Sequence, residues 1–575
     1  MDNNSQLNET KVWRVNIRHE SFTRENVPQT WKRLGGRGLI ARILLDEVLP
    51  TCEPLGPLNK LIFAPGLLVG HMLSSCDRIS IGGKSPLTGG VKEANAGGTT
   101  GLQLAFLGIK ALIIEDKPED DTWVVLKVGH DGVEFDSAEG LIGLGVYECA
   151  KKLIDKYGGK IAIALIGPGG EMQLSSAGIQ NLDKENAPTR IAARGGLGAV
   201  MGSKQIKAII VDAKEGHKPT IAHPDEYRAA QKTFTKMLME APQTAVYRDY
   251  GTAAMARMSN GFGGIPTRNF SAGQFEQVET ISGEFMRQVI LERDGEGEPT
   301  HACMPGCTIR CSNNYPDMNG RSIVTPLEYE TIGLMGSNLG IGDLDVIAKL
   351  NWMVNDLGLD SIEIGAALGV AAKAGLMEFG DGAKAMELLD EIRCKTTLGR
   401  LLGSGATITG KVLGVEQIPA VKGQAFSAYE PRAIKGTGVT YATSPQGADH
   451  TSGLTIRAKI NHLDPVGQAA LSRTVQINMA GYDTLGACIF TGPGFTGAPD
   501  AIRDLLNARY DWDVEADILQ VLGRESLKLE REFNRRAGFT NADVRLPEWM
   551  TREKLPPNFS VFDVPEEDLD GVFNW

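Results

Sequence analysis

Three cysteines within nine residues constrain the centre of this chain more than any other feature. Cys303, Cys307 and Cys311 stand at positions i, i+4 and i+8 of the segment HACMPGCTIRC. Pro305 and Gly306 separate the first two and disfavour a continuous helix, so we expect a loop that turns several thiolates toward one centre. The sequence therefore predicts an inorganic cofactor at this loop.

The cysteine spacing leaves more than one kind of centre open. An iron–sulfur cluster fits best and needs a fourth ligand from elsewhere in the chain. Zinc is the alternative, with His301 as a candidate fourth ligand, and unligated thiols are the third interpretation. The radical-SAM pattern CxxxCxxC fails, because Arg310 stands where a cysteine is required. The other cysteines are scattered and do not indicate a disulfide framework. They are Cys52, Cys76, Cys149, Cys394 and Cys488.

The common nucleotide-binding and protease motifs are broken or missing. RISIGGKS ends like a P-loop, but Arg78 stands where the first glycine is required. GGLGAVMG lacks the full G-x-G-x-x-G pattern and follows NAPTRIAAR, which we expect to be helical rather than a strand. No HExxH segment occurs. The sequence therefore disfavours P-loop, dinucleotide-binding and common metalloprotease functions.

The charge and the apolar pattern indicate a cytoplasmic protein. The formal net charge of −12 disfavours attraction to nucleic acid or to an anionic membrane. No apolar run approaches the roughly 20 residues needed to span a bilayer. The first residues, MDNNSQLNETKVW, show no basic segment followed by an apolar one. We therefore expect no nucleic-acid partner and no membrane span.

Glycine content and apolar runs predict an α+β fold. The 69 glycines among 575 residues imply many tight turns or close backbone approach to a ligand. Short β-like runs fill residues 1–215, and helical periodicity dominates after them. These runs are VWRVNI, LIFAPGLLV, ALIIED, WVVLKV, IAIALIG and AIIVD. We expect a β-rich domain over 1–215, a helical domain with the cysteine loop over 216–420, and a mixed, mainly helical domain over 421–575.

One predicted helix has clear end signals, and two helix ends resemble each other. Residues 343–357 have Asp343 as a plausible N-cap and Gly358 as a C-terminal stop. NDLGLD, from Asn355, and DTLGAC, from Asp483, share a polar residue followed by a glycine three residues later. Two such ends could bind two similar ligands, although ordinary glycine-stopped helices have the same pattern. We also expect helices near 145–157, 502–508 and 518–536, and a solvated strap at 565–575.

Eight segments are weak signals singly but specific in their joint order. They are GGRGLIARIL from Gly35, KSPLTGG with the following EANAGG, ARGGLGAVMGSK from Ala193, the cysteine loop, LEYETIG from Leu327, NDLGLD, YATSPQGADH ending at His450, and DTLGAC ending at Cys488. In this order they resemble the aldehyde ferredoxin oxidoreductase family of tungsten, occasionally molybdenum, enzymes. The resemblance implies a β-rich first domain that forms a base for two pterins, and two largely helical domains that close over them.

The resemblance also implies the cofactors and their ligands. These are a tungsten (or molybdenum) bis-molybdopterin, a 4Fe-4S cluster with Cys488 as its fourth ligand, and Mg²⁺ that bridges the pterin phosphates and is bound by Asn95. The implied pterin-binding residues are Arg78, Asn95, Gly97, Gly98, Arg194, Gly195, Gly196, Asn355, Asp360, Asp483 and Leu485. Glycine backbone, helix ends and a few arginines suit pterin phosphates better than a globally basic surface does.

The chain departs from the family pattern in three places. Three residues separate Cys303 from Cys307, where the family commonly has two. Asn355 stands where some members carry aspartate. No ExxH motif is visible, so the interface metal of part of the family is not expected.

The family reaction is the oxidation of an aldehyde with water to a carboxylic acid, with electrons leaving singly to ferredoxin or an iron–sulfur subunit. We assign Glu330 as the general base, with Glu328 as its substitute, and His450 as the hydrogen-bond donor to the substrate oxygen. One alternative on the same fold is a low-potential reductase of aromatic acyl-CoA thioesters. Alternatives outside it are a zinc-stabilised binding protein without redox activity and an NAD-linked dehydrogenase. A homodimer is expected by analogy only.

Overall fold

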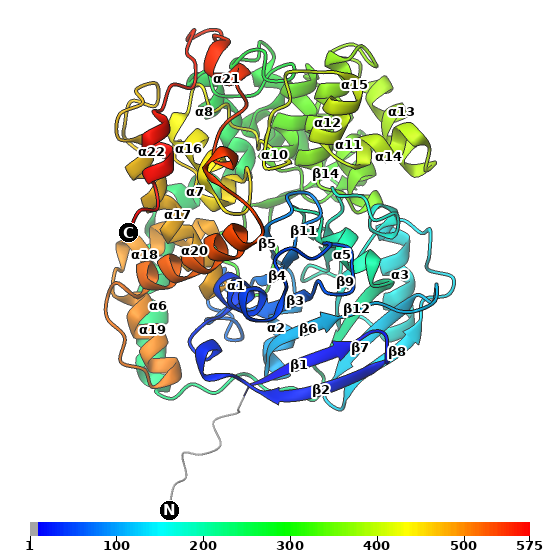
Figure 1. Ribbon diagram of the computed structural model, residues 1–575, viewed down its shortest axis with the longest axis vertical. Coiled ribbons are helices and arrows are strands. Elements are labelled where there is room, and N and C mark those ends of the chain that lie inside the picture. The colour runs from blue at the N-terminus through cyan, green and yellow to red at the C-terminus, as the bar shows by residue number, and fades with distance from the viewer. Residues whose placement is uncertain (1–9) are drawn as a thin grey trace, which may run out of the picture.

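The first domain contains two six-stranded sheets. The computed structural model describes residues 10–575 (Figure 1). The first sheet has the order β2 (Ser21–Asn26), β1 (Lys11–Asn16), β6 (Ile109–Glu115), β3 (Leu61–Pro65), β4 (Ile79–Lys84) and β5 (Val91–Ala96). The second has the order β8 (Gly132–Ser137), β7 (Val124–Gly129), β12 (Ile206–Asp212), β9 (Ala162–Leu165), β10 (Ile179–Asn181) and β11 (Arg190–Ala192). All six predicted β-like runs contain strands.

The two sheets have the same topology. β1 pairs in parallel with β6, β7 pairs in parallel with β12, and every other neighbouring pair is antiparallel. Helices occur at the same points of the strand order in both sheets. In the first they are α1 (Gly36–Glu47) and α2 (Thr100–Phe106), and in the second they are α3 (Val146–Tyr157) and α5 (Leu197–Ser203). The second sheet also has a short helix, α4 (Pro168–Glu171), between β9 and β10. Residues 11–115 and 124–212 therefore form two copies of one β-β-α-β-β-β-α-β unit, which the sequence analysis did not find.

The sheets pack face to face, and each also has a covered outer face. Trp13 and Val15 of β1 share a core with Leu126 and Val128 of β7. The alternate residue Val12 packs in a different core with α1 and C-terminal helices, because successive side chains of a strand point to opposite faces. Strands buried on both faces require apolar residues on both, which explains the continuous apolar runs in this domain.

Helices dominate the rest of the chain, with small sheets among them. The helices are α6 (Pro224–Glu240), α7 (Pro242–Tyr250), α8 (Met255–Gly261), α9 (Gly283–Arg293), α10 (Tyr329–Thr331), α11 (Leu344–Leu357), α12 (Ser361–Lys373), α13 (Gly382–Arg393), α14 (Thr397–Gly403), α15 (Ala406–Leu413), α16 (Lys435–Thr443), α17 (Gln468–Leu485), α18 (Gly492–Gly497), α19 (Ala501–Tyr510), α20 (Ile518–Arg536), α21 (Trp549–Arg552) and α22 (Glu566–Gly571). The added strands are β13 (Glu298–His301), β14 (Ser312–Pro316), β15 (Ser322–Val324), β16 (Ala420–Val421) and β17 (Gln424–Ala425). The α+β prediction is confirmed.

The end signals of the predicted helix at 343–357 are confirmed, and two local predictions are wrong. The Asp343 side chain accepts a hydrogen bond from the backbone N–H of Asp345, and Gly358 adopts a left-handed conformation at the end of α11. NAPTRIAAR contains β11 rather than a helix, because pairing with β10 overrides local propensity. The tail is not a solvated strap: it forms α22 and buries Leu569 and Phe573.

The two similar helix ends have the same geometry, and each meets one copy of the repeated unit. Gly358 after α11 has φ 71° and Gly486 after α17 has φ 79°. The backbone N–H of Gly178 donates to the Gly358 carbonyl at 3.0 Å, and that of Arg78 donates to the Gly486 carbonyl at 3.1 Å. The similarity between NDLGLD and DTLGAC therefore corresponds to the repeated unit of the first domain, since each segment contacts one copy.

Glycines at these junctions allow backbone to approach backbone. A Cβ at Gly66, just after β3, would lie 2.1 Å from the backbone nitrogen of Gly486. A Cβ at Gly167, just after β9, would lie 2.5 Å from the carbonyl carbon of Leu357. No side chain fits at either position without moving a helix end.

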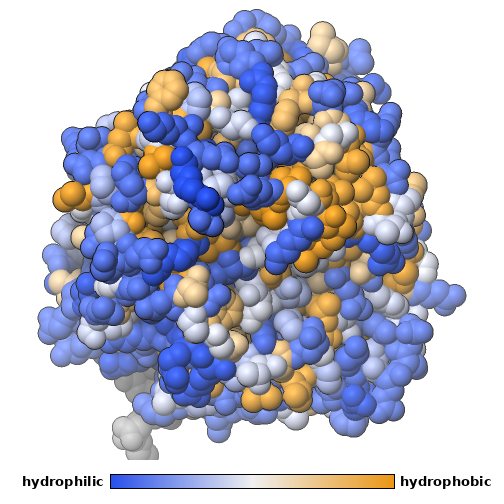
Figure 2. Space-filling model, turned by 45° about the horizontal axis from the view of Figure 1, so that its top comes forward, coloured by the Kyte–Doolittle hydropathy of each residue, from blue (hydrophilic) through white to orange (hydrophobic). Residues whose placement is uncertain are grey.

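The described surface shows no membrane-spanning segment. Within residues 10–575, no helix is both long and apolar enough to cross a membrane. Figure 2 shows a mostly hydrophilic face with a local group of hydrophobic side chains right of centre. The first nine residues, on which the predicted lack of a leader partly depends, lie outside the described part of the chain.

We expect Gly66→Ala to lower the stability of the protein by about 1–3 kcal/mol, because the added methyl group displaces the end of α17. Thermal unfolding of the cofactor-loaded protein measures the change. Gly261→Ala is the matched control, since a Cβ there has no neighbour within 4 Å. Equal melting temperatures for the two variants would show that the junction is not tight.

Candidate functional site

A cavity of about 360 Å³ lies where the two sheets meet the helical part of the chain. Strands β5 and β11, each at the edge of its sheet, lie close together near the centre of the molecule (Figure 1). Of the residues proposed from sequence, the cavity wall contains Arg78, Asn95, Gly97, Cys303, Cys311, Glu330, Asn355, Asp360, His450, Asp483 and Cys488. The fold thus gathers residues that are up to 410 positions apart, from Arg78 to Cys488, into one site.

The four proposed cluster cysteines converge at one side of the cavity. The loop that carries three of them connects β13 to β14, as the Pro–Gly pair predicted. Ser75 connects this loop to Cys488, the fourth proposed ligand. Its hydroxyl lies 3.1 Å from Cys307 Sγ, and its carbonyl accepts a 2.8 Å hydrogen bond from the backbone N–H of Cys488. A hydrogen bond from Cys303 lowers the pKa of Cys307 to about 5, so one sulfur of this pair is readily ionised.

A polar network links the cluster side of the cavity to the first repeated unit. Arg78 Nε donates to Asn95 Oδ1, and Asn95 Nδ2 donates to Asp483 Oδ1 at 3.2 Å. Arg37 lies 3.2 Å from the other oxygen of Asp483 and forms a bidentate pair with Glu530 at 2.7 and 2.9 Å. Burial raises the pKa of Asp483 to about 6 although Arg37 opposes the shift. The helix end after α17 is therefore fixed by charge as well as by backbone contact.

Arg194, which follows β11 in the second repeated unit, makes its own set of contacts behind the cavity wall. Its guanidinium donates to the carbonyls of Ala425 and Ala448, both at 2.6 Å, and to Ser427 Oγ at 3.1 Å. It also lies 3.3 Å from Asp360 Oδ2. Arg194 therefore connects the loop after β11 to segments that reach the cavity.

Several proposed residues do not line the cavity itself. They are Gly98, Arg194, Gly195, Gly196, Leu485 and Cys307. Gly98 and Gly195 have φ values of +100° and +83°, which favour glycine for backbone reasons alone. Gly97 is different, because a Cβ there would lie 3.0 Å from Cys303 Sγ.

Glu330 and His450 form a pair on the cavity wall. Glu330 Oε1 lies 3.3 Å from His450 Nε2, and Glu330 Oε2 accepts a 2.7 Å hydrogen bond from the backbone N–H of Ala428. His450 Nδ1 lies 2.8 Å from Ser427 Oγ. Burial raises the pKa of Glu330, and the neighbouring His450 opposes that shift.

Glu328 also lines the cavity but faces a different partner. Its Oε2 accepts a hydrogen bond from Thr252 Oγ1, and burial raises its pKa. Its electrostatic neighbours include Arg190 and Arg78 rather than His450. The two glutamates of the EYE segment are therefore distinct in the structure, which the sequence could not show.

Arg190 is a cavity residue that the sequence analysis missed. Its Nη1 donates to Ser312 Oγ at 2.9 Å, whereas Nε and Nη2 have no hydrogen-bond partner among the described residues, and Nη2 forms only a long ion pair with Asp183 at 3.5 Å. The side chain is 7% exposed, and leaving buried donors unpaired is unfavourable. These N–H groups suit an anionic ligand. The only sequence signal was an arginine in NAPTRIAAR, a segment that we expected to be helical.

The cavity wall fits an anionic pterin cofactor beside a cysteine-bound cluster. Arg190 offers unpaired donors, which suit a phosphate. Gly97 brings backbone close to Cys303, where an added Cβ would lie only 3.0 Å from the sulfur. Four converging cysteines are also the number of sulfur ligands that an iron–sulfur cluster requires.

Comparisons with known proteins agree with this fold and identify its class as oxidoreductases. Residues 12–213 match the aldehyde ferredoxin oxidoreductase N-terminal domain, and residues 229–570 match domains 2 and 3 of that family. The chain belongs to the aldehyde ferredoxin oxidoreductase family and is an oxidoreductase.

Individual relatives extend over most of the chain. It is 33% identical to the tungsten-containing aldehyde ferredoxin oxidoreductase of Thermococcus kodakarensis, over 92% of this chain and 89% of the relative. It is 29% identical to the aliphatic sulfonate oxidoreductase, WOR-like subunit, of Pyrococcus furiosus, over 81% and 76%. A solved structure of the active site complex BamBC of benzoyl coenzyme A reductase, in complex with 1,5 dienoyl-CoA, matches with a TM-score of 0.79 at 20% identity, over 98% of this chain and 93% of that one, and shows the shared fold.

We expect Arg194→Met to destabilise the protein by about 3–5 kcal/mol, because it leaves Asp360 and two buried carbonyls without their partner. Thermal unfolding measures this effect. Arg228→Met is the control, since it removes an exposed ion pair with Asp225 and leaves the melting temperature unchanged. A stable Arg194→Met protein would show that the buried network is dispensable.

Proposed function

We propose that this chain oxidises aldehydes to carboxylic acids with water and passes the electrons through a 4Fe-4S cluster to ferredoxin. The observation that carries this proposal is the Glu330–His450 pair, 3.3 Å apart on the wall of the cavity that three of the four cluster cysteines also line. The tungsten-containing aldehyde ferredoxin oxidoreductases that are 33% identical over more than nine-tenths of the chain support it.

The cofactor of this reaction is a tungsten (or molybdenum) bis-pterin. Arg190, whose Nε and Nη2 have no hydrogen-bond partner among the described residues, would hold the pterins together with Arg78 and Asp360, and Asn95 would bind the Mg²⁺. Cys303, Cys307, Cys311 and Cys488 would hold the cluster. The bound metal centre supplies the two-electron acceptor and the oxygen chemistry.

Glu330 is the proposed general base. The Ala428 N–H holds one of its carboxylate oxygens, so the other is directed toward His450 and the cavity. Burial raises its pKa, which makes the carboxylate a better proton acceptor than an exposed glutamate. Glu330 therefore takes the proton released when water adds to the aldehyde.

His450 is the proposed hydrogen-bond donor to the substrate oxygen. Arg194 donates to Ser427 Oγ, which leaves the Ser427 hydroxyl hydrogen free to point to His450 Nδ1. This network favours the tautomer with hydrogen on Nε2, the nitrogen that faces Glu330 and the cavity. Arg194 thus acts on the site through Ser427, without touching the substrate.

We expect Glu330→Gln to lower kcat by about 10²- to 10⁴-fold while tungsten and iron contents stay at the wild-type level. In the wild type, kcat/KM rises with pH as Glu330 ionises, with a pKa above the ordinary glutamate value, and this rise is absent in the variant. Steady-state assays with an aldehyde and a dye acceptor measure both effects. The matched variant Glu328→Gln retains the pH profile; the reverse result would assign the base to Glu328.

We expect Cys488→Ser to lose most of the cluster iron, because it removes one of four sulfur ligands. Iron analysis and the low-temperature EPR signal of the reduced cluster measure this loss. Cys76→Ser is the matched control. Cys76 is buried near Cys488 and Cys307, but its thiol donates a hydrogen bond to the Ser74 carbonyl at 3.3 Å and is not a proposed ligand. Loss of iron in the Cys76 variant alone would place the fourth ligand there.

Protein purified without oxygen tests the whole proposal. Metal analysis finds tungsten or molybdenum together with iron, and an aldehyde drives reduction of ferredoxin. Zinc without these metals, or turnover of an aromatic acyl-CoA thioester and of no aldehyde, would overturn it.

A further inference from the structure

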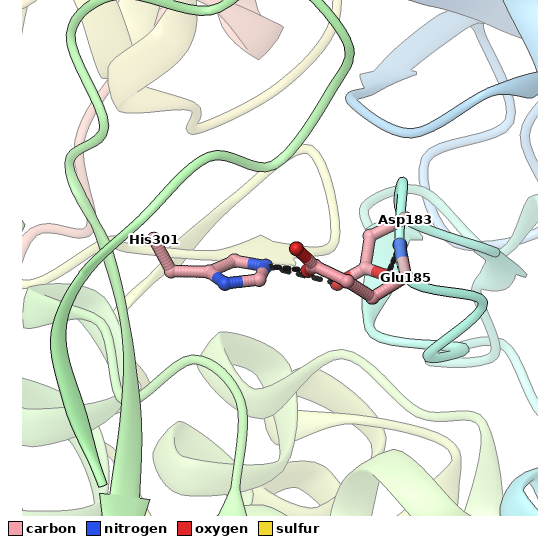
Figure 3. A group of neighbouring side chains, drawn as sticks. All are labelled: Asp183, Glu185 and His301. Carbon is pink, nitrogen blue, oxygen red and sulfur yellow. Dashed lines mark hydrogen bonds and ion pairs between the residues drawn. The ribbon is translucent and has the colours of Figure 1, made fainter.

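A second group of metal-ligand side chains lies outside the cavity, between the two parts of the chain. His301 ends β13, whereas Asp183 and Glu185 belong to the loop between β10 and β11. One ligand atom from each residue lies within 4.8 Å of the others. Figure 3 shows the imidazole of His301 directed toward both carboxylates from the opposite segment. None of the three side chains lines the cavity.

Two carboxylate oxygens converge on one imidazole nitrogen. His301 Nε2 lies 2.8 Å from Glu185 Oε2 and 3.2 Å from Asp183 Oδ2. A single N–H group points at one acceptor, so the hydrogen bond to one of these oxygens has good geometry and the contact with the other does not. Nitrogen and oxygen ligands about 2.1 Å from a metal ion lie about 2.9–3.4 Å apart at the usual coordination angles. The observed spacing is close to that range for both oxygens at once.

The surrounding contacts orient the same three ligand atoms. His301 Nδ1 lies 3.1 Å from Glu298 Oε2, the second contact that metal-binding histidines commonly make to a carboxylate. Asp183 Oδ1 accepts backbone hydrogen bonds from Glu185 and Ala187 at 2.9 and 3.0 Å. Those bonds hold the carboxylate with Oδ2 directed toward the imidazole.

One neighbouring cation leaves its ligand atom available, and the other forms only a long ion pair with Asp183. Lys184 pairs with Glu185 through Oε1, not through Oε2. Arg190 Nη2 lies 3.5 Å from Asp183 Oδ2 but makes no hydrogen bond to it. Asp183 is buried, while the Glu185 side chain is 49% exposed, so an ion can enter from solvent on that side.

We propose that His301, Asp183 and Glu185 bind a structural divalent cation, and that Zn²⁺ is the ion that this donor set fits best. One imidazole and two carboxylates provide three ligands of a tetrahedral site, and water completes it. Zn²⁺ takes the place of the proton on His301 Nε2, which is released to solvent. The site is separate from the proposed cluster and does not depend on the proposed function.

Such a cation fixes the start of the cysteine loop. His301 stands two residues before Cys303, and Asp183 and Glu185 follow β10 in the second repeated unit. The ion thus links the first domain to the strand that leads into the loop.

Zinc binding to the iron-loaded protein tests the site, because the four cluster cysteines are then occupied. The protein is incubated with ZnCl₂, passed through gel filtration and analysed for zinc and iron per chain. The wild type retains one zinc per chain, and Glu185→Gln and His301→Gln bind it at least tenfold more weakly at unchanged iron content. His223→Gln is the matched control, since it breaks an exposed pair with Asp511 at 2.8 Å and retains zinc.

A second measurement covers variants that fold poorly. Zinc raises the melting temperature of the wild type and of His223→Gln but not that of Glu185→Gln, whose exposed side chain can be changed without opening a core. Two results would overturn the proposal: a wild type that retains no zinc, which would identify the group as a protonated histidine with carboxylate partners, or equal zinc retention by Glu185→Gln.

Discussion

Backbone contact between glycine pairs joins the two parts of this molecule. The segment after β3 meets the end of α17 at Gly66 and Gly486, and the segment after β9 meets the end of α11 at Gly167 and Gly358. Neither junction has room for a side chain, so each helix end lies at a fixed height above its sheet. Asp483 and Cys488 near one end, and Asp360 near the other, reach the cavity because of these contacts.

Buried charges reinforce the junctions. Arg37 with Glu530, Lys92 with Asp449, and Arg194 with Asp360 each connect the first domain to a later segment. Removing such charges from water is unfavourable, so a buried ion pair does not by itself show that the pair stabilises the fold. Their position suggests a different use: Lys92 holds Asp449 and Arg194 holds the carbonyl of Ala448, the two residues that precede the proposed reacting group His450.

Local signals in the sequence predicted much of this structure, and pairing between distant segments accounts for the rest. Pro305 and Gly306 predicted the cysteine loop, and Asp343 and Gly358 predicted both ends of α11, because these residues act through nearby backbone. Cys488 joined the site only through the family resemblance, since no local pattern connects it to residues 180 positions away. Arg190 was missed because its segment becomes a strand only when paired with β10. The repeated unit was missed because its two copies share a strand order, which depends on pairing between distant segments and not on a local sequence pattern.

Duplication has a consequence for how such a cavity can change. Each copy of the unit contributes one wall and one arginine–aspartate contact: Arg78 through Asn95 to Asp483 in the first, and Arg194 to Asp360 in the second. A mutation in one copy leaves its counterpart untouched. A site built from two similar halves can therefore become asymmetric by small steps, because one half can change while the other keeps its own contacts.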